Sequence, residues 1–269
     1  MKHDRLAISY HVYSQWGPRL ETPEEIAARL RRFVDRLVEI SPCFAKWRIA
    51  TKRRARFYEA IRDDLAPVIR GLINVDDEGP CEIEGYSLGG YVREQPSDKT
   101  IRFSGNAGAV AAYDHWNGIA VKTSWGQWPD PAIIEYPVFK AILMATVDCW
   151  DPFTCGARSG DLIDHYEQNG PFHEAWMLYV PPHLAKTVQP SDIPVVEAMP
   201  NGGLFLAATT ETFKVDNPVH LEAARRIGRA TRHLNVGKGA EKPPPKQVVM
   251  YHDPKTGEVR PLYPEDAGA

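Results

Sequence analysis

A glycine pair, an apolar strand and a capped helix follow one another between residues 201 and 234, and this run constrains the fold more than any other segment. Gly202 and Gly203 precede an apolar strand that starts at Leu204. Asn217 can cap the next helix through its side-chain oxygen, and Pro218 suits the first helical position, where no donor is needed. Apolar residues recur behind it at spacings of three and four: Val219, Ala223, Ala224, Ile227, Ala230 and Leu234. The run predicts a strand–helix scaffold unit with no activated side chain.

Periodicity predicts further helices along the chain. Thr22 and Glu25 form a capping box, so a helix is expected from there to about Glu39. A second helix is expected from about Lys52, with its end or a bend at Pro67. Pro137 opens a third, almost wholly apolar helix, which is expected to be buried on most sides.

Strand patterns occupy much of the rest. Residues 6–13 alternate, residues 81–126 are expected to form short strands separated by turns, and residues 174–180 and 193–198 are further candidates. The sequence predicts an α+β fold, with a mixed, mainly antiparallel sheet packed with about four helices. It is expected to form one domain over residues 1–269, in which an extended connector at 235–247 leads to a terminal hairpin at 248–263.

Composition narrows the class of protein. With 269 residues, of which 43% are apolar and 25% charged, the chain can bury a substantial core. No apolar stretch reaches the roughly 18 residues that a membrane span needs, and no signal-peptide pattern is found at the start. Cys43, Cys81, Cys149 and Cys155 form no Cys-x-x-Cys pair. We expect a cytoplasmic protein with free thiols and no membrane partner.

Charge is unevenly distributed along the chain. Residues 71–200 carry 7 Lys or Arg against 18 Asp or Glu, although the net charge of the whole chain is only −3. An acidic surface repels nucleic acid and attracts basic protein surfaces. One acidic group, from about Asp148 to Glu174, is a candidate protein-binding surface, with a solvated acidic face as the alternative: Asp148, Asp151, Asp161, Asp164, Glu167 and Glu174.

One basic run departs from this pattern. It is expected to lie near a helix start and to pair with the acidic segment within the molecule: Lys46, Arg48, Lys52, Arg53, Arg54 and Arg56. Direct nucleic-acid binding is therefore not expected, because it would need a basic stripe with interleaved aromatic residues.

Tryptophans gather in the centre of the chain. Trp116, Trp125 and Trp128 lie close together in sequence. Tryptophan is a favoured interface anchor, because it buries a large area at small entropic cost, although core packing is the alternative for each of the three. Trp128 stands in a proline-rich segment and is the one expected to be exposed in a loop.

Two patterns suggest enzyme chemistry without the context that it needs. Residues 85–89 satisfy Gly-x-Ser-x-Gly, which would make Ser87 the nucleophile of a serine hydrolase, the alternative function. The charged alternation before Ser87 and the proline after it fit a glycine-rich strand turn better than a strand-to-helix elbow. Asp161, Asp164 and His165 stand close together, but without the ligand spacing of a metal site. We expect no catalytic residue, metal or cofactor.

The chain resembles a bacterial polymorphic-toxin immunity family, number fifty-two in its series. The resemblance rests on the Gly-Gly-Leu-Phe-Leu strand, on residues 211–220 with Asn217, Pro218 and His220, and on Trp116 and Gly118 as a Trp-x-Gly element. It covers most of the chain. One departure is that no cysteine has a tyrosine four residues before it, although the family carries a Tyr-x-x-x-Cys element.

The resemblance implies a non-catalytic protein that binds a cognate toxin. It further implies that the toxin is a nuclease effector with a restriction-endonuclease-like domain, delivered by a type VI secretion system or a related contact-dependent system. The acidic group and the segment near Trp128 are then expected to face a basic, substrate-binding surface of that toxin.

Overall fold

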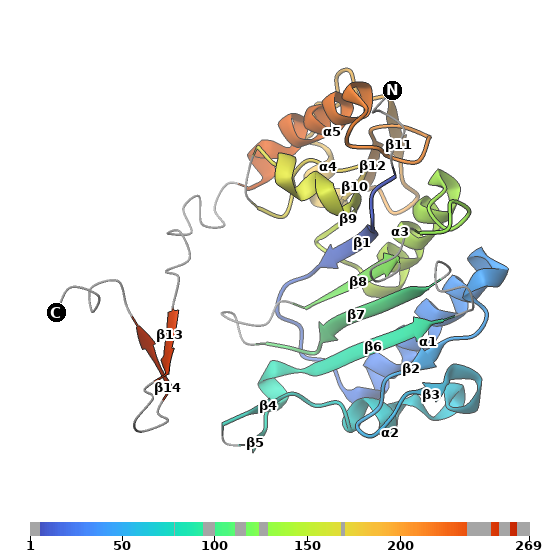
Figure 1. Ribbon diagram of the computed structural model, residues 1–269, viewed down its shortest axis with the longest axis vertical. Helices are drawn as coiled ribbons and strands as arrows, with labels where there is room; N and C mark the ends of the chain where they lie inside the picture. The colour runs from blue at the N-terminus through green and yellow to red at the C-terminus, as the bar shows by residue number, and fades with distance from the viewer. Residues whose placement is uncertain are drawn as a thin grey trace. The chain divides into compact units, whose positions relative to one another are not determined.

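Ten strands form one sheet in the first of two compact units (Figure 1). The computed structural model describes residues 6–77, 79–93, 100–110, 117–123, 129–167, 170–235, 249–252 and 259–262. The units are Met1–Leu234 and Asn235–Ala269, and each is described by itself. Every strand pair in the sheet is antiparallel.

The sheet places the N-terminal strand near its centre. Its strands, in spatial order, are β11 (Val195–Ala198), β12 (Leu204–Ala207), β10 (Met177–Val180), β9 (Thr154–Ser159), β1 (Tyr10–Gln15), β8 (Gly118–Thr123), β7 (Ile101–Ala107), β6 (Tyr86–Val92), β2 (Arg48–Ile49) and β3 (Arg56–Phe57). A separate short pair is formed by β4 (Val75–Asp76) and β5 (Gly79–Pro80).

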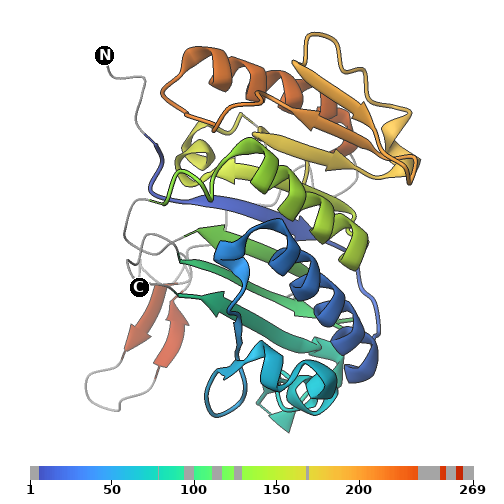
Figure 2. The same cartoon turned by 90° about the vertical axis from the view of Figure 1, so that its right-hand side faces the viewer.

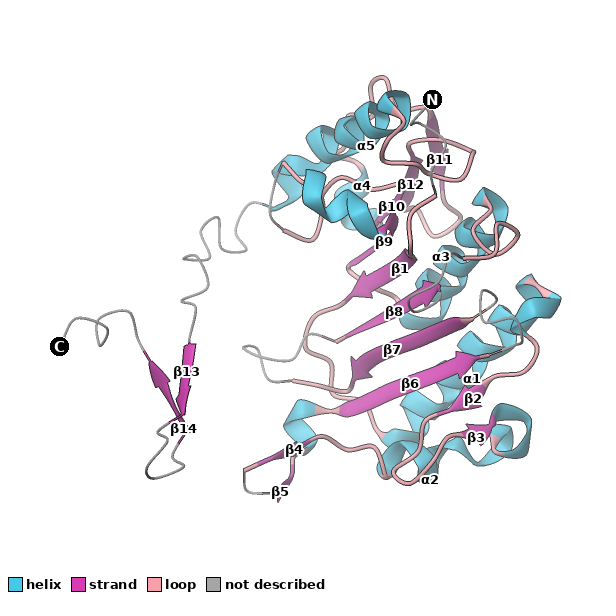
Figure 3. Ribbon diagram, in the orientation of Figure 1, coloured by secondary structure: helices cyan, strands magenta, loops and turns pink. Residues whose placement is uncertain are grey.

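Helices and short helical turns connect these strands (Figure 3). The α-helices are α1 (Pro23–Ile40), α2 (Leu65–Arg70), α3 (Tyr136–Trp150), α4 (Pro182–Ala185) and α5 (Pro218–Thr231). The 3-10 turns are η1 (Pro42–Phe44), η2 (Tyr58–Ala60), η3 (Arg62–Asp64), η4 (Glu82–Glu84), η6 (Gly160–His165) and η7 (Arg232–Asn235). The predicted α+β class, with a mainly antiparallel sheet, is confirmed.

The capping signals place two helices where the sequence predicts them. The Thr22 side chain accepts from the Glu25 amide at 3.2 Å, and the Glu25 carboxylate accepts from the Thr22 amide at 2.8 Å. Asn217 Oδ1 accepts from the Val219 amide at 3.0 Å, directly before Pro218. Each bond satisfies an amide of the first turn that has no partner within its helix.

The helix expected from Lys52 is wrong. Residues 56 and 57 form strand β3, which pairs with β2, and the chain then makes two 3-10 turns before α2 begins at Leu65. Pro67 lies in the first turn of α2. Amides of the first turn have no carbonyl partner within the helix, so the missing amide hydrogen of Pro67 breaks no hydrogen bond and the helix continues past it.

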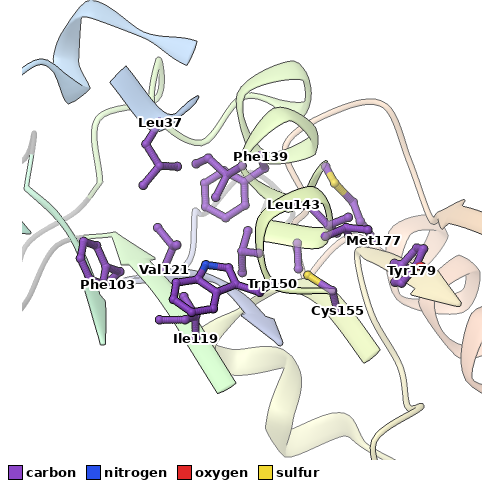
Figure 4. Packing of buried hydrophobic residues seen from close by; sticks show 14 of the residues in the cluster. Leu37, Phe103, Ile119, Val121, Phe139, Leu143, Trp150, Cys155, Met177 and Tyr179 are labelled. Carbon is purple, nitrogen blue, oxygen red and sulfur yellow. The ribbon is translucent and has the colours of Figure 1, made fainter. Parts of the chain in front are cut away.

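One face of the sheet packs against α1 and α3, which lie side by side (Figure 2). Phe33 of α1 meets Phe103 of β7 edge-to-face, with ring centroids 5.8 Å apart, and Trp150 of α3 stacks on Trp16 at 5.4 Å. Figure 4 shows Trp150 within the same buried cluster as Val121 of β8. Full burial of one such side chain is worth about 2 kcal/mol, so this helix–sheet layer holds the larger unit together.

Strand β9 was not expected from the sequence. It lies between β1 and β10, and five of its six residues are buried, all except Arg158. Gly156 is opposite Tyr13, and a Cβ there would lie 2.5 Å from the Tyr13 hydroxyl oxygen. The acidic group of the sequence therefore contains a buried strand at the centre of the sheet, and it does not form one continuous surface segment.

The second unit contains a hairpin. Strands β13 (Val249–His252) and β14 (Val259–Leu262) pair antiparallel, as the sequence predicts. Most of the expected connector, from residue 236 onward, lies outside the described residues, and the expectation of one domain stays a prediction. Among the helices that the structure describes, none is long and apolar enough to cross a bilayer.

Candidate protein-binding surfaces

The acidic candidates at the end of α3 have different surroundings. Asp148 pairs with Arg36 of α1, with 3.1 Å between Oδ2 and Nη2. Asp151 follows α3 in the left-handed conformation, with φ of 50°, and its amide donates to the Val147 carbonyl as the helix ends. Asp151 is exposed, and it forms no ion pair with the part of the chain that the structure describes.

The remaining acidic candidates lie beyond β9. Asp161 and Asp164 are on the η6 turn, where Asp164 is exposed and Asp161 is half-buried. Neither forms an ion pair among the described residues. Glu167 pairs with Arg225 of α5, with 3.0 Å between Oε1 and Nε. Asp161 and Asp164 therefore form a pair of neighbouring acids, and neither has a basic partner among the described residues.

Strand β9 separates the acidic candidates into two sites. Asp148 and Asp151 precede the strand, whereas Asp161 and Asp164 follow it. A six-residue strand spans roughly 17 Å at 3.3 Å per residue, which is beyond the screening length of about 8 Å at physiological salt. The structure therefore brings Asp161 and Asp164 together but does not join them to the α3 end.

Residues near the expected tryptophan loop are only partly described. Trp116, Trp125 and Trp128 lie outside the described residues. Gly118 opens β8 at a close approach of two strands, because a Cβ there would lie 2.4 Å from the Ser14 carbonyl oxygen. Gly118 therefore has a packing role.

The other residues that carry the resemblance also serve the scaffold. Asn217 and Pro218 begin α5, as described above. His220 is buried, its Nδ1 accepts from the Lys214 amide at 3.2 Å, and burial lowers its pKa. Its Nε2 lies 3.5 Å from the exposed Glu211 carboxylate. These contacts fix the turn before α5.

The Gly-x-Ser-x-Gly segment does not form a nucleophile elbow. Ser87 is the second residue of β6, which continues extended to Val92 with no helix after it. The Ser87 hydroxyl donates to Asn74 Oδ1 at 2.7 Å, and the Asn74 amide group donates to Asn106 Oδ1 at 2.8 Å. Within the described residues, Ser87 has no imidazole or carboxylate partner. A serine hydrolase using Ser87 therefore has no support in this geometry.

A polar cluster fills the space between β1, β9 and the segment after η6. His173 Nδ1 donates to the Glu174 carbonyl at 2.9 Å, and its ring centroid lies 4.1 Å from that of Tyr166. Burial lowers the pKa of His173 to about 4, and burial raises the pKa of Glu174. Across the described residues, no group of three or more His, Cys, Asp and Glu side chains is arranged to hold a metal ion. This cluster is best described as buried packing.

The basic run has a different environment from the one expected. It lies on β2, on the β2–β3 connection and beside them, and all six side chains are exposed: Lys46, Arg48, Lys52, Arg53, Arg54 and Arg56. None of the six forms an ion pair with a described residue, so the expected pairing with the acidic segment has no support within the described part of the chain. The guanidinium of Arg48 lies over the Phe57 ring at 4.1 Å.

The residue-level geometry thus offers surfaces and no catalytic centre among the described residues. A comparison with curated proteins finds no match. A family model described as immunity protein 52 matches residues 9–236, from just before β1 to just beyond η7. The match covers most of the chain and nearly all of the first unit, and so the chain belongs to the immunity protein 52 family.

Proposed function

We propose that this protein binds a cognate bacterial toxin and neutralises it by occlusion, without catalysing a reaction. The observation that carries this proposal is the family match, which spans the whole ten-stranded sheet and its helices. An immunity protein acts by forming a complex, so its function resides in an exposed surface presented by a rigid scaffold.

The finer assignment within this proposal is a nuclease effector of a type VI secretion system, or of a related contact-dependent system. Its support is the resemblance: the length suits a protein similar to TsiT, the partner of the restriction-endonuclease-fold toxin TseT. A nuclease must attract polyphosphate and therefore presents basic surface, which an acidic surface of an inhibitor complements.

Asp161 and Asp164 on η6 are the toxin-facing acids in this proposal. They are neighbours, they follow a buried strand that fixes their position, and they have no basic partner among the described residues. Asp148 and Glu167 are already paired with arginines, which reduces their field at a distance. Trp128, outside the described residues, stays a proposed aromatic anchor of the same interface.

Co-expression with the product of the gene adjacent to this chain's gene, as the candidate toxin, tests the function. We expect the protein to restore growth of cells that express the toxin, and the two purified proteins to form a stable complex. No protection and no complex would contradict the proposal.

Charge reversal at η6 tests the placement. The double variant Asp161→Lys with Asp164→Lys should slow association with the toxin about tenfold at low salt, and less at high salt, because steering is screened. The control is Glu39→Lys with Glu82→Lys, which changes the net charge equally at exposed sites on α1 and η4. Equal kinetics for the two variants would exclude η6 from the interface.

A further inference from the structure

Basic and aromatic side chains line up across one face of the sheet, although they come from distant parts of the sequence. The strand registers pair Arg158 with His11, His11 with Lys122, and Lys122 with Arg102. They continue from Arg102 to Tyr91, and from Tyr91 to Arg48. Directly paired residues point to the same face of a sheet. These six residues, from β9 to β2, are called the cationic row.

The cationic row lies on the face opposite α1 and α3. Along β7 and β8, Phe103 and Val121 are buried, whereas their neighbours Arg102 and Lys122 are only half-buried. Since alternate residues of a strand point to opposite faces, the row is on the side away from Phe33 of α1. Figure 1 shows α1 behind β6 and β7, so this face of the strands is turned toward the viewer.

Like charges act on one another within the row. The pKa of His11 is lowered to about 4, first by burial and then by Lys122, Arg158 and Arg102. Burial lowers the pKa of Lys122 too, and Arg102 and Arg158 lower it further. Lys122 forms no ion pair among the described residues. His11 is therefore uncharged near neutral pH, and Arg158 donates to the Tyr166 hydroxyl in the cluster described above. The positive charge of the row comes from its arginines and Lys122, and it attracts an anionic partner.

The row continues into the exposed edge of the sheet. Arg48 stacks on Phe57 of β3, which is the last strand in the sheet order. Arg56 is paired with the buried Ile49, so it points to the face that carries α1. There the β2–β3 connection lines a hollow of about 530 Å³ with Thr51, Lys52, Arg53, Arg54 and Arg56, opposite residues of α2 and Gly71. Tyr91 and Phe57 are among the large exposed hydrophobic side chains. Arginine and tyrosine are among the residue types enriched at interface hot spots.

We propose that the cationic row and the β2–β3 edge form a second binding surface, which takes an acidic face of the toxin. This inference rests on the proposed function. It adds that the toxin contacts this surface through carboxylates, which arginine guanidinium groups bind through paired hydrogen bonds.

An acidic polypeptide fits this surface better than a nucleic acid does. The row ends at Arg158, and Asp161 and Asp164 follow it within a few residues. A polyphosphate is negative along its whole length, whereas a protein surface can present basic groups to these carboxylates and acidic groups to the row.

The variant that tests this inference is Arg48→Glu with Lys122→Glu. Its control is Arg32→Glu with Lys186→Glu, which reverses two exposed charges on α1 and after α4 and gives the same net charge. Binding to the toxin from the neighbouring gene, to poly-L-glutamate and to a DNA duplex is measured at low and high salt. Circular dichroism checks that both variants are folded.

We expect the row variant to lose about tenfold in toxin association rate and to lose salt-dependent poly-L-glutamate binding, with the control unchanged. Toxin binding by the wild type with no loss in the row variant would overturn the inference and leave the proposed function intact. If the wild type does not bind the toxin, the proposed function fails, and poly-L-glutamate still tests the row. Tighter binding to the duplex than to poly-L-glutamate would overturn the choice of an acidic polypeptide.

Discussion

Arg36 and Asp148 form an ion pair that joins α1 to α3, with 3.1 Å between Nη2 and Oδ2. Both side chains are about half exposed, at 53% and 50%. An exposed pair of this kind contributes about 0.5 kcal/mol, because water screens it. The acidic residue that the sequence assigns to a toxin surface thus already has a partner in its own molecule.

Asp148→Asn is therefore expected to change toxin association little, by about twofold or less, and stability by about 0.5 kcal/mol. Asp161→Asn removes a charge without a basic partner among the described residues and is expected to slow association more. Stopped-flow association at two salt concentrations measures both variants. A larger effect of Asp148→Asn than of Asp161→Asn would move the acidic surface to the end of α3.

Glu21 has a structural role that the expected acidic surface does not include. Its side chain is only 4% exposed, and its carboxylate lies 2.6 Å from Arg29 Nε and 3.0 Å from Arg19 Nε. The two arginines also donate to the carbonyls of Cys149 and Trp150, the last residues of α3. Glu21 thus holds two cations at the negative end of a helix, where they satisfy carbonyls without helical partners.

Glu21→Gln should destabilise the protein by about 2 kcal/mol. This is less than the cost of breaking a fully buried ion pair, because the two arginines are about a quarter exposed and water can solvate them. The control is Glu24→Gln, which breaks an exposed pair with Arg70 and should cost about 0.5 kcal/mol. Urea unfolding followed by tryptophan fluorescence compares them. Equal midpoints for the two variants would contradict the role of Glu21.

His173 should make the protein less stable in mild acid. Its pKa is lowered to about 4 by burial, so the unfolded chain binds a proton at a pH where the folded protein does not. Stability is complete above an unfolded pKa of about 6.5 and falls as pH decreases toward about 4, by up to about 3 kcal/mol. His11, whose pKa burial also lowers to about 4, contributes in the same window, so His173→Gln should reduce this dependence by about half, whatever it costs at neutral pH.

The pH dependence is measured as urea midpoints between about pH 7 and pH 5, within the window in which the unfolded histidine is protonated. His183→Gln, at an exposed position on α4, is the matched control and should leave the slope unchanged. A slope in His173→Gln as steep as that of the wild type would assign the proton uptake to other groups, with His11 the first candidate.

Local signals in the sequence predicted the elements that depend on few residues. The Thr22 and Glu25 capping box and the Asn217 cap act within one turn, and both helices begin where expected. Strand β9 was missed because its centre, Cys155-Gly156-Ala157, has neither β-branched residues nor alternation, and pairing with β1 and β10 determines its conformation. Long-range pairing likewise turns Arg56 and Phe57 into a strand.

The cationic row could not be predicted from single segments. Arg158, His11, Lys122 and Arg102 are isolated basic residues in separate strands, and each looks like an ordinary solvent-facing position. Only the strand order and register place them side by side. The count of charges along the chain correctly found the acidic excess, but it contained no information on which acids have partners across the fold.

The Gly-x-Ser-x-Gly segment should prove structural when its residues are replaced one at a time. Gly85 has φ of 71°, and a Cβ there would lie 2.4 Å from the Ala107 carbonyl oxygen, so Gly85→Ala should destabilise by about 2 kcal/mol or more. Gly89 lies in strand β6, where a Cβ would contact Ala50 Cβ at 3.5 Å, so Gly89→Ala should change stability by about 1 kcal/mol or less.

Ser87→Ala loses only its bond to Asn74, and we expect it to protect cells from the toxin as the wild type does. Thermal unfolding and the growth assay together decide the matter, because a stable, folded Ser87→Ala protein that fails to protect would restore a catalytic role for this serine.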